Sequence, residues 1–310
     1  MSNDFDPNRP KAEQLAREVS SALDRAGIHH ILWGQLAFSV YSGNFPCNHI
    51  DFVVPNEDLD RACNNLDSTN LPCVTDNPSC SYWLIPEGSH AERIFHIDAL
   101  NADEVLIHFD IRIFPMSWAL PGYQQIAYRT FTDVIDRKDL ILCSDQRLKG
   151  RFIYERYPIR MLAPVHYLQS IISRYLGLGS GLEIIRQFHR EVITPLNEEG
   201  DTSEGFCMES LHFSYNIMLY SILHSLDENE IKATAEGVQS YLNAYEAHLS
   251  QMQEVREGLE AVEEADEEDE EPNESEETTS DDEQSDEAKD EEQMEDVNGD
   301  ETQVDVMDVE

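Results

Sequence analysis

The chain has 310 residues, and 63 acidic side chains against 21 basic ones give it a formal net charge of −42. Residues 261–310 hold 26 of the acids and one lysine, which leaves −17 for the first 260 residues. This acidic body argues against broad, nonspecific binding to the phosphates of nucleic acids, although it leaves room for a local basic groove.

The first part of the chain alternates between helical and strand-like patterns. Pro10 suits the first turn of a helix because its missing backbone N–H costs nothing there, and Gly27 ends that helix. Asn56 follows a strand-ending proline and is placed to act as the N-cap of a third helix. The predicted elements in order are a helix over 10–26, a strand over 29–34, a helix over 35–42, a strand over 49–55 and a helix over 56–66.

The middle of the chain is rich in β-forming residues. Strands are predicted over 82–86, 92–100 and 104–115, with a further edge strand over 139–143. The short stretch "NADE" separates the second of these from the third. Two strand-like segments joined by so short a turn predict an antiparallel hairpin.

From Pro158 onward the apolar residues recur at helical spacing. Pro164 opens a helix, and further helices are predicted over 181–193, 208–227 and 229–262. The order of elements predicts an α+β fold, in which a mixed β-sheet with flanking helices precedes a helical C-terminal lobe. The expected divisions are an α+β domain over 1–157, a helical lobe over 158–260 and an acidic tail over 261–310.

The acidic tail contains no aromatic residue and has long runs of Glu and Asp. Such a segment cannot bury enough apolar surface to offset its chain entropy, so we expect it to be disordered. Its charge of −25 favours contact with basic proteins, such as histones, through long-range attraction.

Six cysteines occur without any C-x-x-C pair, and no run of about 18 apolar residues is present. No apolar segment of a secretory leader stands near the start of the sequence. These features predict a soluble protein with free thiols, cytoplasmic or nuclear, without contact with a membrane.

The stretch from Gly34 to Asp51 carries the pattern with the most chemical meaning. Gly34-Gln35 stands where a strand meets a helix, and after 13 intervening residues His49-Ile50-Asp51 opens the next strand. A glycine-led turn before a helix can bring backbone N–H groups to phosphates. Residues at i and i+2 of a strand point to the same face, which is the simplest way to aim two metal ligands at one site.

These motifs resemble those of the nucleotidyltransferase superfamily, which has the polymerase-beta-like fold. That family has a Gly-Gly or Gly-Ser pair at a strand end, a helix, and an acid-aliphatic-acid triplet on the next strand. The resemblance covers about a third of the chain, residues 12–115. Within the superfamily, these motifs are similar to those of abortive-infection-toxin-type proteins and of uncharacterised fungal chains with "ILWG" and "IDFVVP" phrases.

The resemblance implies a site that holds Mg²⁺ with a nucleotide. Asp51 and Asp110 would be the catalytic carboxylates, with Asp98 as an alternative to Asp110. Asp51, Asp110 and His49 would surround the metal. Gly34 and Gln35 would bind the nucleotide cofactor. The alternatives from the residues themselves are a salt bridge between Asp51 and an arginine such as Arg112, and a plain strand-to-helix glycine at position 34 that needs a positive φ.

Two positions depart from the family pattern. Gln35 replaces the second small residue, and His49 replaces the first acid, although imidazole suits transition metals better than Mg²⁺. The sequence therefore predicts a degenerate member, a pseudoenzyme that binds a nucleotide or a partner with little or no transfer. The alternatives are an active metal-dependent nucleotidyltransferase acting on RNA, protein or a small molecule, and an acidic-tailed interaction protein for basic partners.

Overall fold

A computed structural model of the chain describes residues 6–267, apart from 44–46, 70–92, 122–136, 153–156, 180, 201–202, 204 and 226. The chain divides into two compact units, residues 1–252 and residues 253–310. The sheet and every side chain discussed below belong to the first unit. The strand predicted over 82–86 and the acidic tail beyond residue 267 lie outside the described residues.

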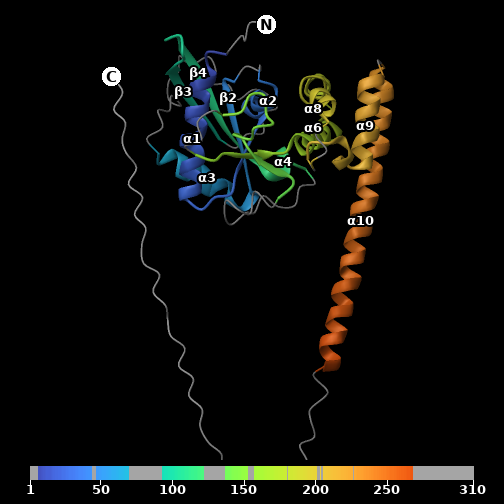
Figure 1. Cartoon of the computed structure of the whole chain (residues 1–310). Helices are drawn as coiled ribbons and strands as arrows, with labels where there is room; N and C mark the ends of the chain where they lie inside the picture. Colours follow the sequence, from blue (N-terminus) through green and yellow to red (C-terminus); the bar gives the residue numbers. More distant parts are fainter. Residues whose placement is uncertain are drawn as a thin grey trace, which may run out of the picture. The chain divides into compact units, whose positions relative to one another are not determined.

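Six strands of the described residues form one mixed sheet in the order β3-β4-β2-β1-β6-β5. Figure 1 labels three of them, β2, β3 and β4. Their bounds are β1 (Ile31–Trp33), β2 (His49–Val54), β3 (Arg93–Leu100), β4 (Leu106–Pro115), β5 (Leu140–Leu142) and β6 (Arg160–Leu162). β2 runs parallel to β4 and β1 parallel to β6, whereas the pairs β1–β2, β3–β4 and β5–β6 are antiparallel. The predicted mixed sheet, its hairpin and its edge strand near 140 are confirmed.

Helices make up most of the remaining described residues. They are α1 (Arg9–Arg25), α2 (Gly34–Ser42), α3 (Leu59–Asp67), α4 (Met116–Ala119), α6 (Pro164–Leu178), α7 (Leu182–Phe188), α8 (Thr194–Glu199), α9 (Phe213–His224) and α10 (Glu228–Glu267). A π-helical turn, His189–Ile193, joins α7 to α8. The predicted α+β class with a helical C-terminal part is therefore confirmed.

Several element boundaries differ from the predictions, among them the strand predicted over 29–34 and the helix predicted over 208–227, and two further differences have a clear physical reason. Asn56 does not cap a helix, because a 3₁₀ turn (Asn56–Asp58) precedes α3 and the Asn56 side chain accepts a hydrogen bond from the backbone N–H of Ser117 at 3.0 Å. That N–H lies in the first turn of α4, where it has no partner within the helix. The last helix extends to Glu267, beyond the predicted start of the tail at 261, since Ala and Glu are strong helix formers.

The sheet includes strands from both sides of residue 157. β6 begins at Arg160 and pairs with β1 through Leu32 and Met161, both fully buried. In the part of the chain that the structure describes, no helix is long and apolar enough to cross a membrane.

The two faces of the sheet differ in chemistry. One face is apolar and fully buried, with Ile50, Phe52 and Val54 of β2 beside Phe109, Ile111 and Ile113 of β4. Phe52 packs edge-on against His30, whose ring nitrogen lies 2.6 Å from the hydroxyl of Ser20 in α1. Helix α1 contacts β2 and α3 contacts β4. The opposite face carries the polar residues Asp51, Asp110 and Arg112 together with the buried apolar residues Val53 and Phe114.

Candidate functional site

Strand register gathers polar residues on the second face of the sheet. Trp33 pairs with Asp51 across β1 and β2, and His49 and Asp51 pair with Asp110 and Arg112 across β2 and β4. Residues that are paired across neighbouring strands point to the same face of the sheet, and so do residues two apart on one strand. Trp33 and Asp51 thus lie on adjacent strands, and His49, Asp51 and Asp110 share one face.

Asp51 is held in an ion pair with Arg112. The guanidinium donates from Nε to one carboxylate oxygen at 2.6 Å and from an Nη to the other at 2.7 Å, and Asp51 is only 1% exposed. Burial alone would lower the pKa of Arg112, but the Asp51 carboxylate outweighs burial and raises it. Both oxygens of Asp51 are therefore bound by Arg112. This is the salt bridge that the sequence offered as an alternative to a metal site.

Gly34 meets this carboxylate from the start of α2. Its φ is +69°, and a Cβ added there would lie 1.9 Å from Oδ2 of Asp51. Any side chain would collide with a buried, ion-paired carboxylate, so both the backbone angle and the close approach demand glycine. Gln35, the next residue, has a buried Oε1 without a hydrogen-bond partner among the described residues.

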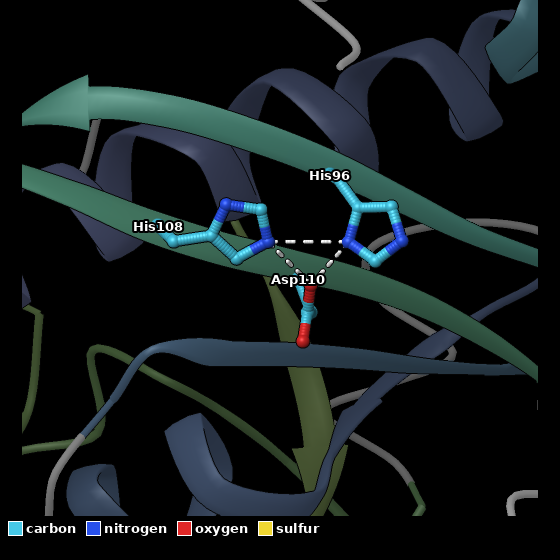
Figure 2. Close-up of side chains that lie close together, drawn as sticks. All are labelled: His96, His108 and Asp110. Atoms are coloured by element: carbon cyan, nitrogen blue, oxygen red, sulfur yellow. Dashed lines mark hydrogen bonds and ion pairs between the residues drawn. The ribbon is translucent and has the colours of Figure 1, made fainter. Parts of the chain in front are cut away.

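Asp110 occupies a different environment from Asp51, although their strands are adjacent. One of its oxygens, Oδ1, lies 2.7 Å from Nδ1 of His96 and 3.1 Å from Nε2 of His108 (Figure 2). The other oxygen lies 3.4 Å from Nε2 of His49. Burial and the cation of Arg112 lower the pKa of His49, which favours a neutral ring. Asp110 is thus surrounded by imidazoles.

Asp98 lies further along β3, where its register partner is His108. One carboxylate oxygen of Asp98 lies 2.7 Å from Nδ1 of His108. Asp98 therefore contacts a histidine of β4, and β4 separates it from β2. Asp110 is the acid that directly faces His49 in the sheet.

Aromatic rings and a second arginine, which the sequence patterns did not single out, lie beside the ion pair. The guanidinium of Arg174 in α6 stacks on Trp118 at 3.9 Å and on Trp33 at 4.8 Å from the ring centroids. Burial lowers the pKa of Arg174. The hydroxyl of Tyr167 in α6 donates to the carbonyl of Gly34 at 3.2 Å. Apart from Trp33, these groups stand at residues 118, 167 and 174, far from the motif, so no local spacing could reveal them.

The donor set does not fit a pair of Mg²⁺ ions. Mg²⁺ demands near-octahedral oxygen coordination, usually by one or two carboxylates and water. Here Arg112 engages both oxygens of Asp51, and three histidines surround Asp110. Nitrogen donors of this kind suit zinc and other transition metals instead.

Comparison with known proteins finds solved structures that align with this chain. No family model and no curated protein matches the chain. An antigenic nucleotidyltransferase-like protein from Paracoccidioides brasiliensis aligns with a TM-score of 0.37 and 14% identity, over 60% of this chain and 76% of that one. The antibiotic-resistance factor ANT(2'')-Ia aligns with a TM-score of 0.29 and 13% identity, over 77% and 96% respectively.

Because the two TM-scores are this low, the alignments carry no argument about the function of this chain. Its function has to be inferred from the chemistry of its own residues.

Proposed function

We propose that the chain is a degenerate nucleotidyltransferase-fold protein that works by binding a nucleotide or a partner, with little or no transferase activity. The observation that carries this proposal is the two-pronged ion pair from Arg112 to Asp51. The carboxylate that the family resemblance would give to a metal is neutralised by a side chain on the adjacent strand.

The energetics support a permanent ion pair. Removing one partner of a buried pair leaves an uncompensated charge and costs about 3–5 kcal/mol. A metal ion that recruited Asp51 would have to displace Arg112 and leave its guanidinium beside the incoming cation. Two-metal catalysis of phosphoryl transfer depends on carboxylates that are free to clamp both ions.

The surroundings of the ion pair suit an anionic ligand better than a metal ion. Asp51 already matches the charge of Arg112, so the further cation of this region is Arg174, which lies over Trp33 immediately before the start of α2 at Gly34. Arginine recognises phosphates through charge-assisted N–H donors, and the N-terminus of a helix also favours negative charge. A nucleotide carries such phosphates, so it is the first ligand to test.

The test is transfer of label from nucleoside triphosphates in the presence of Mg²⁺ or Mn²⁺, together with equilibrium binding of the same nucleotides. Transfer should be absent or very weak, while binding should weaken in Arg174→Met. Robust transfer by the wild-type chain that disappears in Asp51→Ala would overturn the proposal and favour an active transferase. Lys232→Met, an exposed change on α10, is a matched control for the loss of one positive charge.

The residues Gly34 and Gln35 are part of the same proposal as contacts to the nucleotide. Gln35→Ala removes the buried Oε1 that lacks a partner in the described residues. If a ligand group donates to that oxygen, the variant should bind nucleotide more weakly. Unchanged affinity would remove Gln35 from the proposed site.

A further inference from the structure

The hairpin β3–β4 carries two histidines and a carboxylate whose ligand atoms converge. Nδ1 of His96, Nε2 of His108 and one oxygen of Asp110 all lie within 4.8 Å of one another (Figure 2). We propose that these three side chains bind a divalent transition-metal ion of the zinc class, with a fourth position open to solvent. This inference does not depend on the proposed nucleotide-binding function.

The spacing of the donor atoms suits a tetrahedral ion. Zinc binds imidazole nitrogen at about 2.0–2.1 Å, so neighbouring ligands of a regular tetrahedron lie about 3.3 Å apart. The two nitrogens are 3.2 Å apart, and they lie 2.7 and 3.1 Å from the oxygen of Asp110. The three edges already approach the tetrahedral value, so an ion requires only small side-chain shifts.

The convergence of two ring nitrogens on each other needs an explanation. Protons cannot satisfy all three contacts at once when Asp110 is a carboxylate. If one ring nitrogen carries a hydrogen, the other nitrogen and the oxygen face each other with lone pairs; if both carry one, the two nitrogens face each other as donors. A cation at the centre uses all three lone pairs at once. Zinc, unlike Mg²⁺, accepts two nitrogen donors and one oxygen.

Asp98 orients the imidazole ring of His108. Its carboxylate lies 2.7 Å from Nδ1 of His108 and can accept that N–H, which directs the lone pair of Nε2 at the cluster. A carboxylate behind a metal-binding histidine is the usual support of such a ligand. The cluster therefore has an outer partner of the kind that known zinc sites use.

The strands hold the ligands in place. His96 pairs with Asp110 and Asp98 pairs with His108 in one antiparallel register. Ligands built on paired strands are held more rigidly than ligands on loops. The three side chains are 9–14% exposed, so the cluster is shielded yet open enough for an ion to enter.

The experiment is a titration of the full chain with Zn²⁺ and Co²⁺ after treatment with a chelator. Millimolar Mg²⁺ should be present throughout, so that the acidic tail is already occupied by a hard cation. We expect one tight equivalent of Zn²⁺, a rise in the thermal midpoint, and the intense visible absorption of tetrahedral Co²⁺. A chain that binds neither ion more tightly than the Mg²⁺-saturated background would overturn the proposal, whatever the variants do.

Variants separate this site from adventitious binding. His108→Ala should weaken Zn²⁺ binding at least about 100-fold, and Asp98→Asn should weaken it about 10–100-fold, the usual effect of losing an outer partner. His248→Ala, which removes an exposed histidine of α10, should change nothing. Equal affinity in His108→Ala and wild type would refute the assignment. If His108→Ala does not fold, His96→Gln provides the same comparison.

His49 decides whether the fourth ligand comes from the protein. It lies 3.4 Å from the second oxygen of Asp110 and outside the compact group of three. His49→Ala should leave Zn²⁺ affinity within a few-fold of the wild-type value and keep the Co²⁺ spectrum four-coordinate. A loss as large as that in His108→Ala would contradict the open fourth position.

Discussion

The ion pair between Asp51 and Arg112 allows a quantitative test of its structural role. Replacing Arg112 with Met removes the guanidinium but keeps an unbranched apolar stem on β4. Asp51 would then be a carboxylate with 1% exposure and no cation within hydrogen-bonding distance among the described residues. Breaking a buried pair in this way costs about 3–5 kcal/mol of unfolding free energy, and the partial exposure of Arg112 favours the lower end.

A double-mutant cycle isolates the interaction itself. Asp51→Asn keeps the shape of the side chain and removes its charge, and it can still accept from Arg112. In the double variant Asp51→Asn, Arg112→Met no charge remains, so its free energy of unfolding should exceed the sum expected from the single variants by about 2 kcal/mol. Urea denaturation followed by tryptophan fluorescence measures all four chains.

Two results would refute this reasoning. An Arg112→Met variant as stable as the wild type would mean that Asp51 needs no partner. Strict additivity of the single variants would mean that the two side chains do not interact. In either case the ion pair could not account for the proposed lack of transferase activity.

The other predictions concern a glycine, a buried histidine and the tail. Gly34→Ala should lower the free energy of unfolding by more than about 2 kcal/mol. Gly27 also has a positive φ, +66°, but open space around it, so Gly27→Ala should cost only about 1 kcal/mol. Equal losses in urea unfolding would contradict the contact of Gly34 with Asp51. Burial lowers the pKa of His30 to about 4. In the unfolded chain this histidine has its ordinary pKa of about 6.5, so as pH falls the unfolded state binds the proton before the folded state does. Between pH 8 and pH 5 the free energy of unfolding of the wild type should therefore fall by about 2 kcal/mol more than that of His30→Gln. Parallel pH profiles of the two chains would refute this. Removing residues 268–310 should leave the thermal midpoint unchanged and abolish a salt-sensitive pull-down of histones; pull-down that persists at high salt would point to specific contacts instead.

Sequence patterns by themselves predicted five of the six described strands and their order along the chain, but not β6, because the apolar spacing from Pro158 onward is helical. Local rules decide these features, since alternation of apolar residues marks strands such as 49–54 and a short polar turn joins the hairpin strands. The positions of Gly34 and Asp51 on neighbouring elements followed from the same patterns. The resemblance to nucleotidyltransferases then indicated which face to inspect.

The hairpin contained a signal that the sequence patterns could have revealed. Antiparallel partners are spaced symmetrically about the turn, so a turn centred near residue 103 brings residue 96 opposite 110 and residue 98 opposite 108. The search for metal-ligand spacing along the chain missed this cluster because its ligands are close only across the hairpin.

Tertiary structure alone decided the chemistry of the two acids. Asp51 and Asp110 look equivalent in the sequence, since each stands in an apolar strand. Parallel pairing of β2 with β4 places Arg112 opposite one of them and His49 opposite the other, and β3 adds His96. The charge state and ligands of a buried carboxylate depend on neighbours within a few ångströms, and here those neighbours come from 61 positions away in the chain or from across a hairpin. Pairing between distant strands is a property of the whole fold, which no local pattern contains.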